Sequence, residues 1–129
     1  MNPSVKEIEA VSKLTPLKRY KYFIKKIADS EAVWTIVDSN NDFSLSKIES
    51  YTLISLWPTE AYIIPNLADG WKTHQPIQLS LEELEKQIFP IAQKQDYLFN
   101  IFSVNGKSGF IVSLEELIRD LNYEIETWY

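Results

Sequence analysis

The strongest constraint on the fold is a helix-starting pattern that occurs twice, each time directly after a strand-like run. Ser-Leu-Glu-Glu stands at residues 80–83 and again at 113–116. In such a capping box the serine and the third-following glutamate satisfy each other's free backbone amides. Outside this shared pattern the two regions do not match, so the chain is not an internal repeat. The second half of the chain is therefore expected to run strand, helix, hairpin, helix.

Hydrophobic periodicity and turn residues predict the other elements. Thr15 and Pro16 form a good helix start, with a capping hydroxyl followed by proline at the first helical position. Pro90 is expected to kink or end the helix that contains it. In chain order we expect a weak helix at 4–12, a helix at 16–29, strands at 32–37, 43–47 and 50–57, a short helix at 59–67, a loop at 68–75, a strand at 76–79, a helix at 81–94, strands at 97–104 and 110–112, and a final helix from 114.

This order mixes helices and strands without strict alternation, which is typical of an α+β fold. The chain has 129 residues, close to the ~150 of one average domain. We expect a single domain over residues 1–129, in which residues 1–15 are an N-terminal extension with a weak helix. Its sheet is expected to be antiparallel or mixed, with five to six strands and with helices packed mainly on one face.

Composition removes several classes of function. The chain has no cysteine, which excludes disulfides, thiolate metal sites and cysteine nucleophiles. No apolar stretch approaches the ~18–20 residues that span a bilayer, and the first residues lack the continuous apolar region of a secretory signal. We therefore expect a cytoplasmic protein that does not bind membranes.

The net charge of −5 is unevenly distributed. Residues 1–26 carry a local excess of basic groups, whereas the rest of the chain is strongly acidic. An acidic body repels phosphates and argues against nucleic-acid binding, but it complements a protein partner with a basic surface. The basic stretch at 18–26 is interpreted as the solvated face of an amphipathic helix, with a small anionic-ligand patch as the alternative.

One segment has the spacing of calcium ligands. Asp38, Asn40, Asp42 and Glu49 occupy positions 1, 3, 5 and 12 of an EF-hand loop. However, Phe43 stands where that loop needs glycine, and the flanking segments look like strands. We interpret the segment as a polar hairpin turn and assign no metal site.

No set of residues predicts catalysis. His74 is the single histidine, and no nucleophile-elbow glycines accompany it. Ser44 and Lys47 have the spacing of a serine acylase pair, but the companion motifs are missing. Residues 106–108 resemble the end of a phosphate-binding loop without its first glycine or its helix. We therefore assign no catalytic residue and expect no cofactor.

The four tryptophans are more informative. Trp34 and Trp128 fall on positions of a strand and a helix that are expected to face the core. Trp57 ends a strand, and Trp71 lies in a polar loop, where an indole either joins a binding surface or covers the edge of a small core. The candidate binding residues are Trp57, Glu60, Trp71, Lys72 and His74.

Several segments together resemble a known family. They are KRYKYFIKKIADSEAVW (18–34), LWPTEAY (56–62), the Pro-led strand with its LEEL helix, and FNIFSVNGKSGFIVSLEEL (99–117). Over about residues 16–126 the chain resembles the small bacterial proteins grouped as domain of unknown function family 2750. That family commonly has Gly-Trp where this chain has Asp42-Phe43. The resemblance supports the architecture and implies no activity.

The leading hypothesis is a non-catalytic protein that binds a macromolecular partner, in an immunity-like or regulatory role. The second is a small-ligand-binding domain that uses residues 56–74, with Lys72 and His74 as polar contacts. The third is an enzyme. The sequence does not indicate the oligomeric state.

Overall fold

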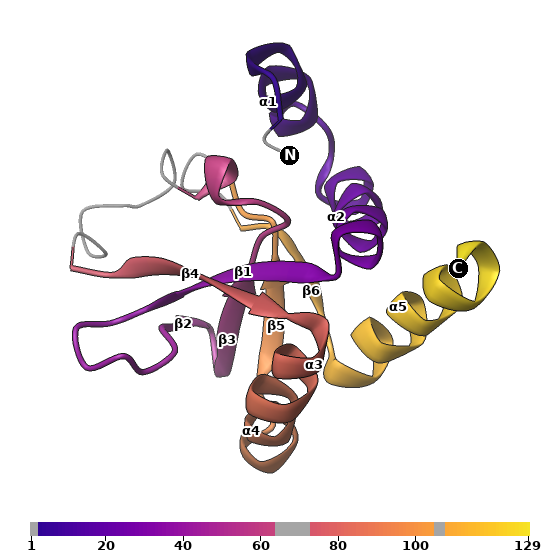
Figure 1. Cartoon of the computed structure of the whole chain (residues 1–129). Helices are drawn as coiled ribbons and strands as arrows, with labels where there is room; N and C mark the ends of the chain where they lie inside the picture. The colour runs from indigo at the N-terminus through magenta and orange to yellow at the C-terminus, as the bar shows by residue number, and fades with distance from the viewer. Residues whose placement is uncertain (1–2, 64–72, 105–107) are drawn as a thin grey trace.

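The strands of this protein lie in two sheets. The computed structural model describes residues 3–63, 73–104 and 108–129 (Figure 1). Strand β1 (Ala32–Val37) pairs antiparallel with β4 (Gln75–Ser80). The second sheet has the order β2-β3-β5-β6, and its strands are β2 (Leu45–Ile48), β3 (Tyr51–Leu56), β5 (Leu98–Ile101) and β6 (Phe110–Val112). In this sheet β3 and β5 are parallel and the other pairs are antiparallel. The predicted α+β fold with a mixed sheet is confirmed.

The helices begin where the sequence predicts and for the predicted reasons. Helix α1 (Val5–Ser12) is capped by Ser4, and α2 (Pro16–Ser30) by Thr15. Both capping boxes form, at the start of α3 (Leu81–Glu83) and of α5 (Leu114–Trp128). A short 3-10 turn, η1 (Glu60–Tyr62), occupies part of the predicted helix at 59–67. Helices α2 and α5 lie side by side against the strands (Figure 1).

The helix that starts at Leu81 changes its winding before Pro90. The π-helical turn η4 (Leu84–Ile88) follows α3, and α4 (Phe89–Gln95) follows η4. Pro90 has no amide hydrogen, and its ring crowds the carbonyl four residues earlier. A wider turn before Pro90 accommodates the ring while the helix continues, so the predicted kink takes the form of a π turn.

One core lies between α2, α5 and the sheets. Phe23 and Ile27 of α2, Phe99 of β5 and Leu117 of α5 have no exposed surface. Full burial of a side chain of this size contributes about 1.5–3 kcal/mol. This core fixes the position of α2 against β1 and α5, and the pockets described below lie along α2.

Two predicted features are wrong in detail. The strand expected at 97–104 ends at Ile101, because Phe102 adopts a positive φ of 63° that no strand continues through. Arg19, placed by the sequence on a solvated helix face, is buried, and its guanidinium Nε donates to the Phe102 carbonyl at 3.0 Å. The other basic residues of the first two turns of α2, Lys18 and Lys21, are exposed.

The polar segment at 38–42 is a turn, as predicted. The Asp38 carboxylate accepts the backbone amides of Asn40 and Asp42 at 2.8 and 3.1 Å. Within the described residues, no group of three or more His, Asp or Glu side chains is arranged to hold a metal ion. None of the helices in these ranges is both long and apolar enough to cross a membrane.

Candidate functional site

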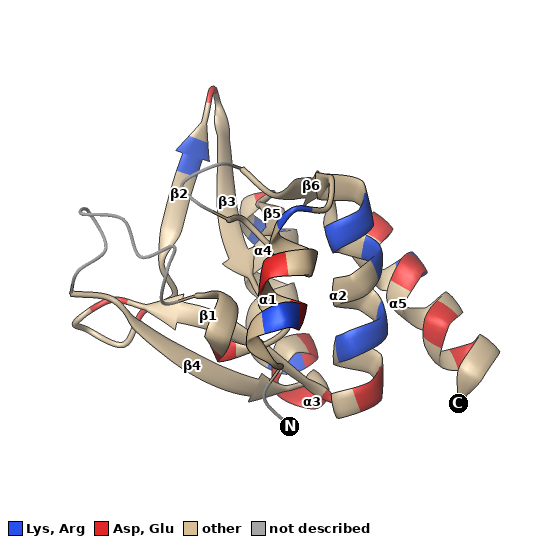
Figure 2. Ribbon diagram, turned by 90° about the horizontal axis from the view of Figure 1, so that it is seen from above, with Lys and Arg blue, Asp and Glu red and all other residues tan. Residues whose placement is uncertain are grey.

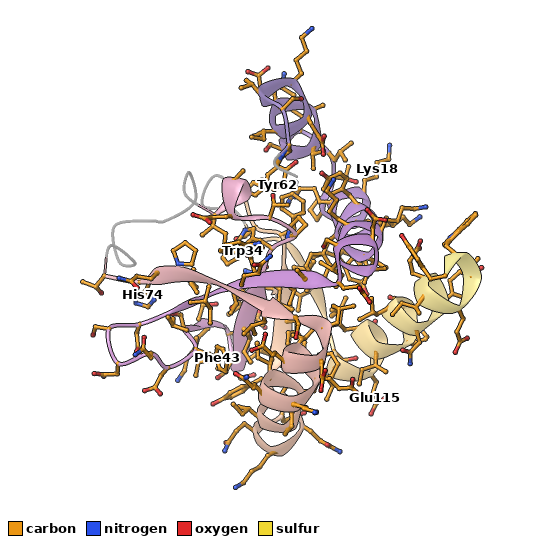
Figure 3. The ribbon with its side chains drawn as sticks, viewed as in Figure 1. Lys18, Trp34, Phe43, Tyr62, His74 and Glu115 are labelled. Atoms are coloured by element: carbon orange, nitrogen blue, oxygen red, sulfur yellow. The ribbon has the colours of Figure 1, made fainter. Side chains whose placement is uncertain are left out.

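The predicted binding residues do not form one surface. Trp71 and Lys72 lie outside the described residues. Trp57 is fully buried, Glu60 is exposed, and His74 is partly buried next to the first residue of β4. Figure 3 shows that His74 lies far from Trp34 and Tyr62, at the opposite end of β4 from α2. The five residues therefore include one core residue and two separate surface positions.

Trp57 is a core residue, so its assignment to a binding surface is wrong. Its indole Nε1 donates to the Ser103 carbonyl at 3.0 Å, and its backbone pairs with Trp34. A strand-terminal tryptophan before proline can face either way, and here the buried carbonyl supplies the partner that the indole N–H requires. Trp57 acts on the surface only indirectly, by fixing Trp34.

His74 pairs with Ser44. The Ser44 hydroxyl oxygen lies 2.5 Å from His74 Nδ1, which is the first half of a nucleophile–base arrangement. However, Ser44 is buried, and its own amide donates to the Ile36 carbonyl at 3.0 Å, so this amide cannot stabilise an oxyanion. The pair joins the segment before β2 to the start of β4, and we interpret it as a structural contact.

A polar pocket lies between the end of α2 and the start of β1, and we call it the inner pocket. Its volume is about 520 Å³. Alternate residues Ala32 and Trp34 share one face of β1, and Gln78 of β4 stands opposite Trp34. Helix α2 contributes one wall and the segment after β3 another, so that the lining residues are Lys26, Asp29, Ser30, Ala32, Trp34, Pro58, Thr59, Glu60 and Gln78.

The inner pocket has an excess of unpaired negative charge. Lys26 is its cation, and the Lys26 Nζ lies 3.8 Å from a carboxylate oxygen of Glu7 in α1. Asp29 accepts a hydrogen bond from the Tyr129 hydroxyl at 3.1 Å, which leaves its charge uncompensated. The Glu60 side chain has neither a hydrogen bond nor an ion pair within the described part of the chain. Two carboxylates therefore face a pocket whose lysine is already paired.

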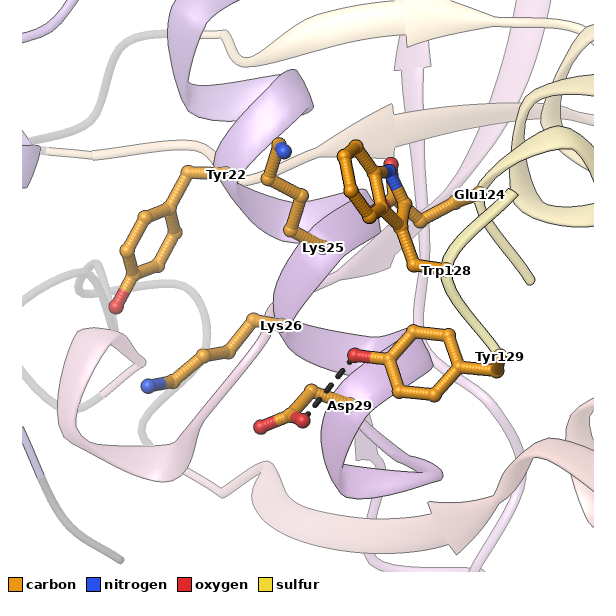
Figure 4. A pocket seen from close by; sticks show the side chains of 7 residues that line it. All are labelled: Tyr22, Lys25, Lys26, Asp29, Glu124, Trp128 and Tyr129. Atoms are coloured by element: carbon orange, nitrogen blue, oxygen red, sulfur yellow. Dashed lines mark hydrogen bonds between the residues drawn. The ribbon is translucent and has the colours of Figure 1, made fainter. Parts of the chain in front are cut away.

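A second pocket adjoins the first across α2, and we call it the outer pocket (Figure 4). It has a volume of about 540 Å³ and shares Lys26 and Asp29 with the inner pocket. Its other lining residues are Tyr22, Lys25, Glu124, Trp128 and Tyr129. The Lys25 Nζ lies 5.6 Å from the centre of the Trp128 ring, within range of a cation–π contact.

Trp128 is not a core residue, contrary to the sequence interpretation. It is 66% exposed. The end of α5 extends past the strands (Figure 1), and the other residues that line the pocket with Trp128 come from α2 and from the C-terminal end of the chain. The apolar stripe of α5 therefore continues beyond the surface that it could cover. The result is an exposed aromatic side chain on the rim of the outer pocket.

Tyr22 links the outer pocket to α1. Its hydroxyl donates to the Glu7 carboxylate, and it lies 3.3 Å from the Tyr62 hydroxyl. Burial, followed by the hydrogen bond to Glu7, raises the pKa of Tyr22 well above its usual value. Tyr22 is therefore a neutral donor at physiological pH, and it holds Glu7 where that carboxylate pairs with Lys26.

The comparison with protein families decides the classification. The family described as "Protein of unknown function (DUF2750)" matches residues 20–121. The chain belongs to this family. A search of curated proteins finds no match to it. Every residue that lines the inner pocket lies inside the matched segment, whereas Glu124, Trp128 and Tyr129 of the outer pocket lie beyond it.

The inner pocket has the chemistry of a binding site. Its carboxylates accept hydrogen bonds and attract cations, its indole offers a flat apolar wall, and Ser30, Thr59 and Gln78 add neutral polar groups. The sequence pointed to Glu60 but missed Asp29, Thr59 and Gln78, and it assigned Trp34 to the core. The alternation of residues along β1 could have placed Trp34 on the pocket face with Ala32. However, both faces of β1 carry apolar residues, so the sequence does not show which face is buried.

Proposed function

We propose that this protein is a non-catalytic, cytoplasmic binding protein with a basic protein partner, in an immunity-like or regulatory role. A lysine or arginine side chain of the partner enters the inner pocket. The observation that carries the proposal is that two carboxylates, Asp29 and Glu60, line one pocket together with Trp34, and that the lysine of this pocket is paired with Glu7.

An aromatic wall and two carboxylates together favour a cationic group. An ammonium or guanidinium over an indole face gains about 0.5–2 kcal/mol, and a carboxylate adds a charge-assisted hydrogen bond. Arginine suits such a site because its planar group can stack on an indole and bind a carboxylate at the same time. Trp34 is positioned for this role because its strand is fixed to Trp57 below it.

The outer pocket extends the surface available to the partner. Trp128 and Tyr129 are both two-thirds exposed and lie next to the shared Asp29. Tryptophan and tyrosine are enriched among the residues that dominate protein interfaces. A partner segment that enters the inner pocket would therefore continue across α2 onto these rings.

The non-catalytic part of the proposal rests on the chemistry of the lining. The inner pocket combines carboxylates, hydroxyls, an amide and an indole, and its lysine is held by Glu7. The Ser44–His74 pair, the nearest approach to a nucleophile and its base, lies elsewhere (Figure 3). A reaction would need these groups in one place.

The test is a titration of isotope-labelled protein with oligo-arginine and oligo-lysine peptides, followed by NMR. We expect the largest shifts at Trp34 Nε1 and at the amides around Glu60. The double variant with Asp29→Asn and Glu60→Gln should weaken binding about tenfold or more, since charge-assisted hydrogen bonds are lost. Glu82→Gln is the matched control, because Glu82 pairs with Lys86 on a different helix. Equal binding by the double variant and the wild type would overturn the proposal.

A small cationic ligand in the same pocket is the second candidate. The observation that favours it is the Thr59 hydroxyl, which is buried and has no hydrogen-bond partner within the described ranges. Buried hydroxyls normally have a partner, and a small ligand with a donor beside its cation would supply one. Thermal-shift measurements with arginine and agmatine separate the two candidates. A ligand that binds the native state raises Tm, whereas a peptide-specific site leaves Tm unchanged with either compound.

A further inference from the structure

A third pocket lies on the other side of α2 from the inner pocket, between α2, β6 and α5. Its volume is about 410 Å³, and most of its lining is apolar. Leu17, Tyr20 and Ile24 follow one another on the same face of α2, and Phe110 and Val112 share one face of the edge strand β6. Small-molecule pockets have about this size and an apolar lining with few polar groups.

Three polar side chains that line this pocket are bound to one another. The Tyr20 hydroxyl donates to the Asp120 carboxylate at 2.6 Å, and the Arg119 guanidinium donates to the other oxygen of that carboxylate at 3.0 Å. The Tyr20 ring lies 5.1 Å from the Phe110 ring. Because these polar groups are paired with one another, the surface that remains for a ligand consists of aromatic rings and aliphatic groups.

Lysine and glutamate side chains from the two facing helices line the pocket. Lys21 on α2 and Glu124 on α5 line the pocket, and neither side chain has a hydrogen bond or ion pair within the described residues. The other charged groups have other contacts: Arg119 pairs with Asp120, Glu116 accepts the Ser113 amide in its capping box, and Lys25 lies over the Trp128 ring. Figure 2 shows the corresponding separation of colour, with basic residues along α2 and acidic residues along α5.

We propose that this pocket binds a free α-amino acid with an apolar side chain. The side chain packs on Tyr20, Ile24 and Phe110, the carboxylate faces Lys21, and the ammonium group faces Glu124. A purely anionic amphiphile would meet Glu124 without a partner for it, and a purely cationic one would meet Lys21 in the same way. A zwitterion with an apolar side chain can contact Lys21, Glu124 and the apolar lining at the same time.

The test compares three ligands that differ by one charge. Labelled protein is titrated with L-phenylalanine, N-acetyl-L-phenylalanine and L-phenylalanine amide, and chemical shifts of Tyr20, Phe110 and Val112 are followed. The zwitterion should bind about fivefold more tightly than either derivative, the scale of one exposed ion pair. Equal affinities for the three compounds, or no saturable shift with L-phenylalanine, would overturn the proposal.

Two surface variants assign the charges. Lys21→Gln should weaken phenylalanine about fivefold and leave the amide unchanged, whereas Glu124→Gln should weaken phenylalanine and leave the N-acetyl derivative unchanged. Lys18→Gln and Glu126→Gln are the controls, since these exposed side chains lie on the same helices outside the pocket lining. If each variant weakens the binding of all three compounds equally, Lys21 does not bind the ligand's carboxylate, Glu124 does not bind its ammonium group, and the proposal is wrong. All these side chains are at the surface, so folding is preserved.

Discussion

Trp34 and Trp57 exchange two backbone hydrogen bonds, with N···O distances of 2.9 and 2.8 Å, and these bonds join the two sheets. The Thr35 hydroxyl adds a third link, donating to the Ser55 carbonyl at 2.7 Å. Because Trp57 is buried and Trp34 lines the inner pocket, the core residue sets the position of the surface residue. The β1 wall of the inner pocket is therefore tied to the junction between the sheets.

Replacing Trp57 tests this junction. Trp57→Phe removes the indole donor from the Ser103 carbonyl and leaves a void in the core. We expect a loss of about 2–3 kcal/mol in the free energy of unfolding, from the buried carbonyl and the lost volume together. Urea unfolding measures it. Trp128→Phe, at an exposed position, should change stability by less than about 0.5 kcal/mol. Equal losses of unfolding free energy in the two variants would contradict the assignment of Trp57 to the core and of Trp128 to the surface.

Much of the fold is visible in the sequence because its signals are local. Capping residues place the starts of α2, α3 and α5, and Pro90 marks the change in winding of its helix. The division into two sheets is not visible, because it depends on which strands pair. Periodicity does not show that the ladder partner of β1 is β4. Strand β3 also lies against β1, but its links to β1 are the Thr35–Ser55 hydrogen bond and the Trp34–Trp57 bridge just after β3. Such long-range choices are made by the packing of the whole core.

The site was less predictable than the fold. The sequence indicates Glu60 as a candidate binding residue, but Trp34 lies in a strand that is apolar on both faces. Some of the residues that carry the family resemblance are structural. Arg19, Trp57 and Asn100 bind the backbone of Phe102, Ser103 and Gly109, respectively. These three contacts hold one irregular stretch of backbone, and the segments at 18–34 and 56–62 that carry the same resemblance also contain most of the residues that line the inner pocket.

The second prediction concerns Arg19. Its Nε donates to the Phe102 carbonyl at 3.0 Å, and its Nη1 donates to the Leu14 carbonyl. Burial lowers the pKa of this guanidinium. Both hydrogen bonds depend on the fixed, planar arrangement of its N–H donors. Arg19→Lys keeps the charge but cannot reach both carbonyls, so unfolding should become easier by about 1.5–3 kcal/mol. Thermal and urea unfolding measure the loss. Lys18→Gln, one residue earlier and exposed, should have no measurable effect.

The third prediction concerns Gly109, where the backbone passes close to β5. A Cβ built on Gly109 would lie 2.0 Å from the Ile101 carbonyl oxygen. This oxygen is a backbone atom, so it cannot turn away as the end of a flexible side chain could. The Gly109 amide also donates to the Asn100 side chain at 2.7 Å. Gly109→Ala should therefore destabilise the protein by about 2–4 kcal/mol. Ser108→Ala, at the exposed neighbouring position, should be neutral in the same unfolding experiment, and a neutral Gly109→Ala would contradict this close approach.

The last prediction is a pH dependence centred on Asp120. Burial acts to raise the pKa of this carboxyl, but the hydrogen bonds from Arg119 and Tyr20 outweigh it, so that the pKa lies below the ordinary value. A carboxyl whose pKa is lowered on folding stabilises the native state above its unfolded pKa of about 3.9, and this stabilisation is lost as the pH falls through the folded value.

Asp120→Asn removes the titrating group and weakens both hydrogen bonds. Wild type should therefore be more stable than Asp120→Asn at pH 6, by about 1–2 kcal/mol, and the difference should shrink as the pH falls below about 4. Urea unfolding of both proteins across this pH range measures the difference, which cancels the titration of the other carboxylates. Glu126→Gln is the control on the same helix, since Glu126 is exposed, and a wild-type advantage over Asp120→Asn that is constant with pH would contradict the assignment.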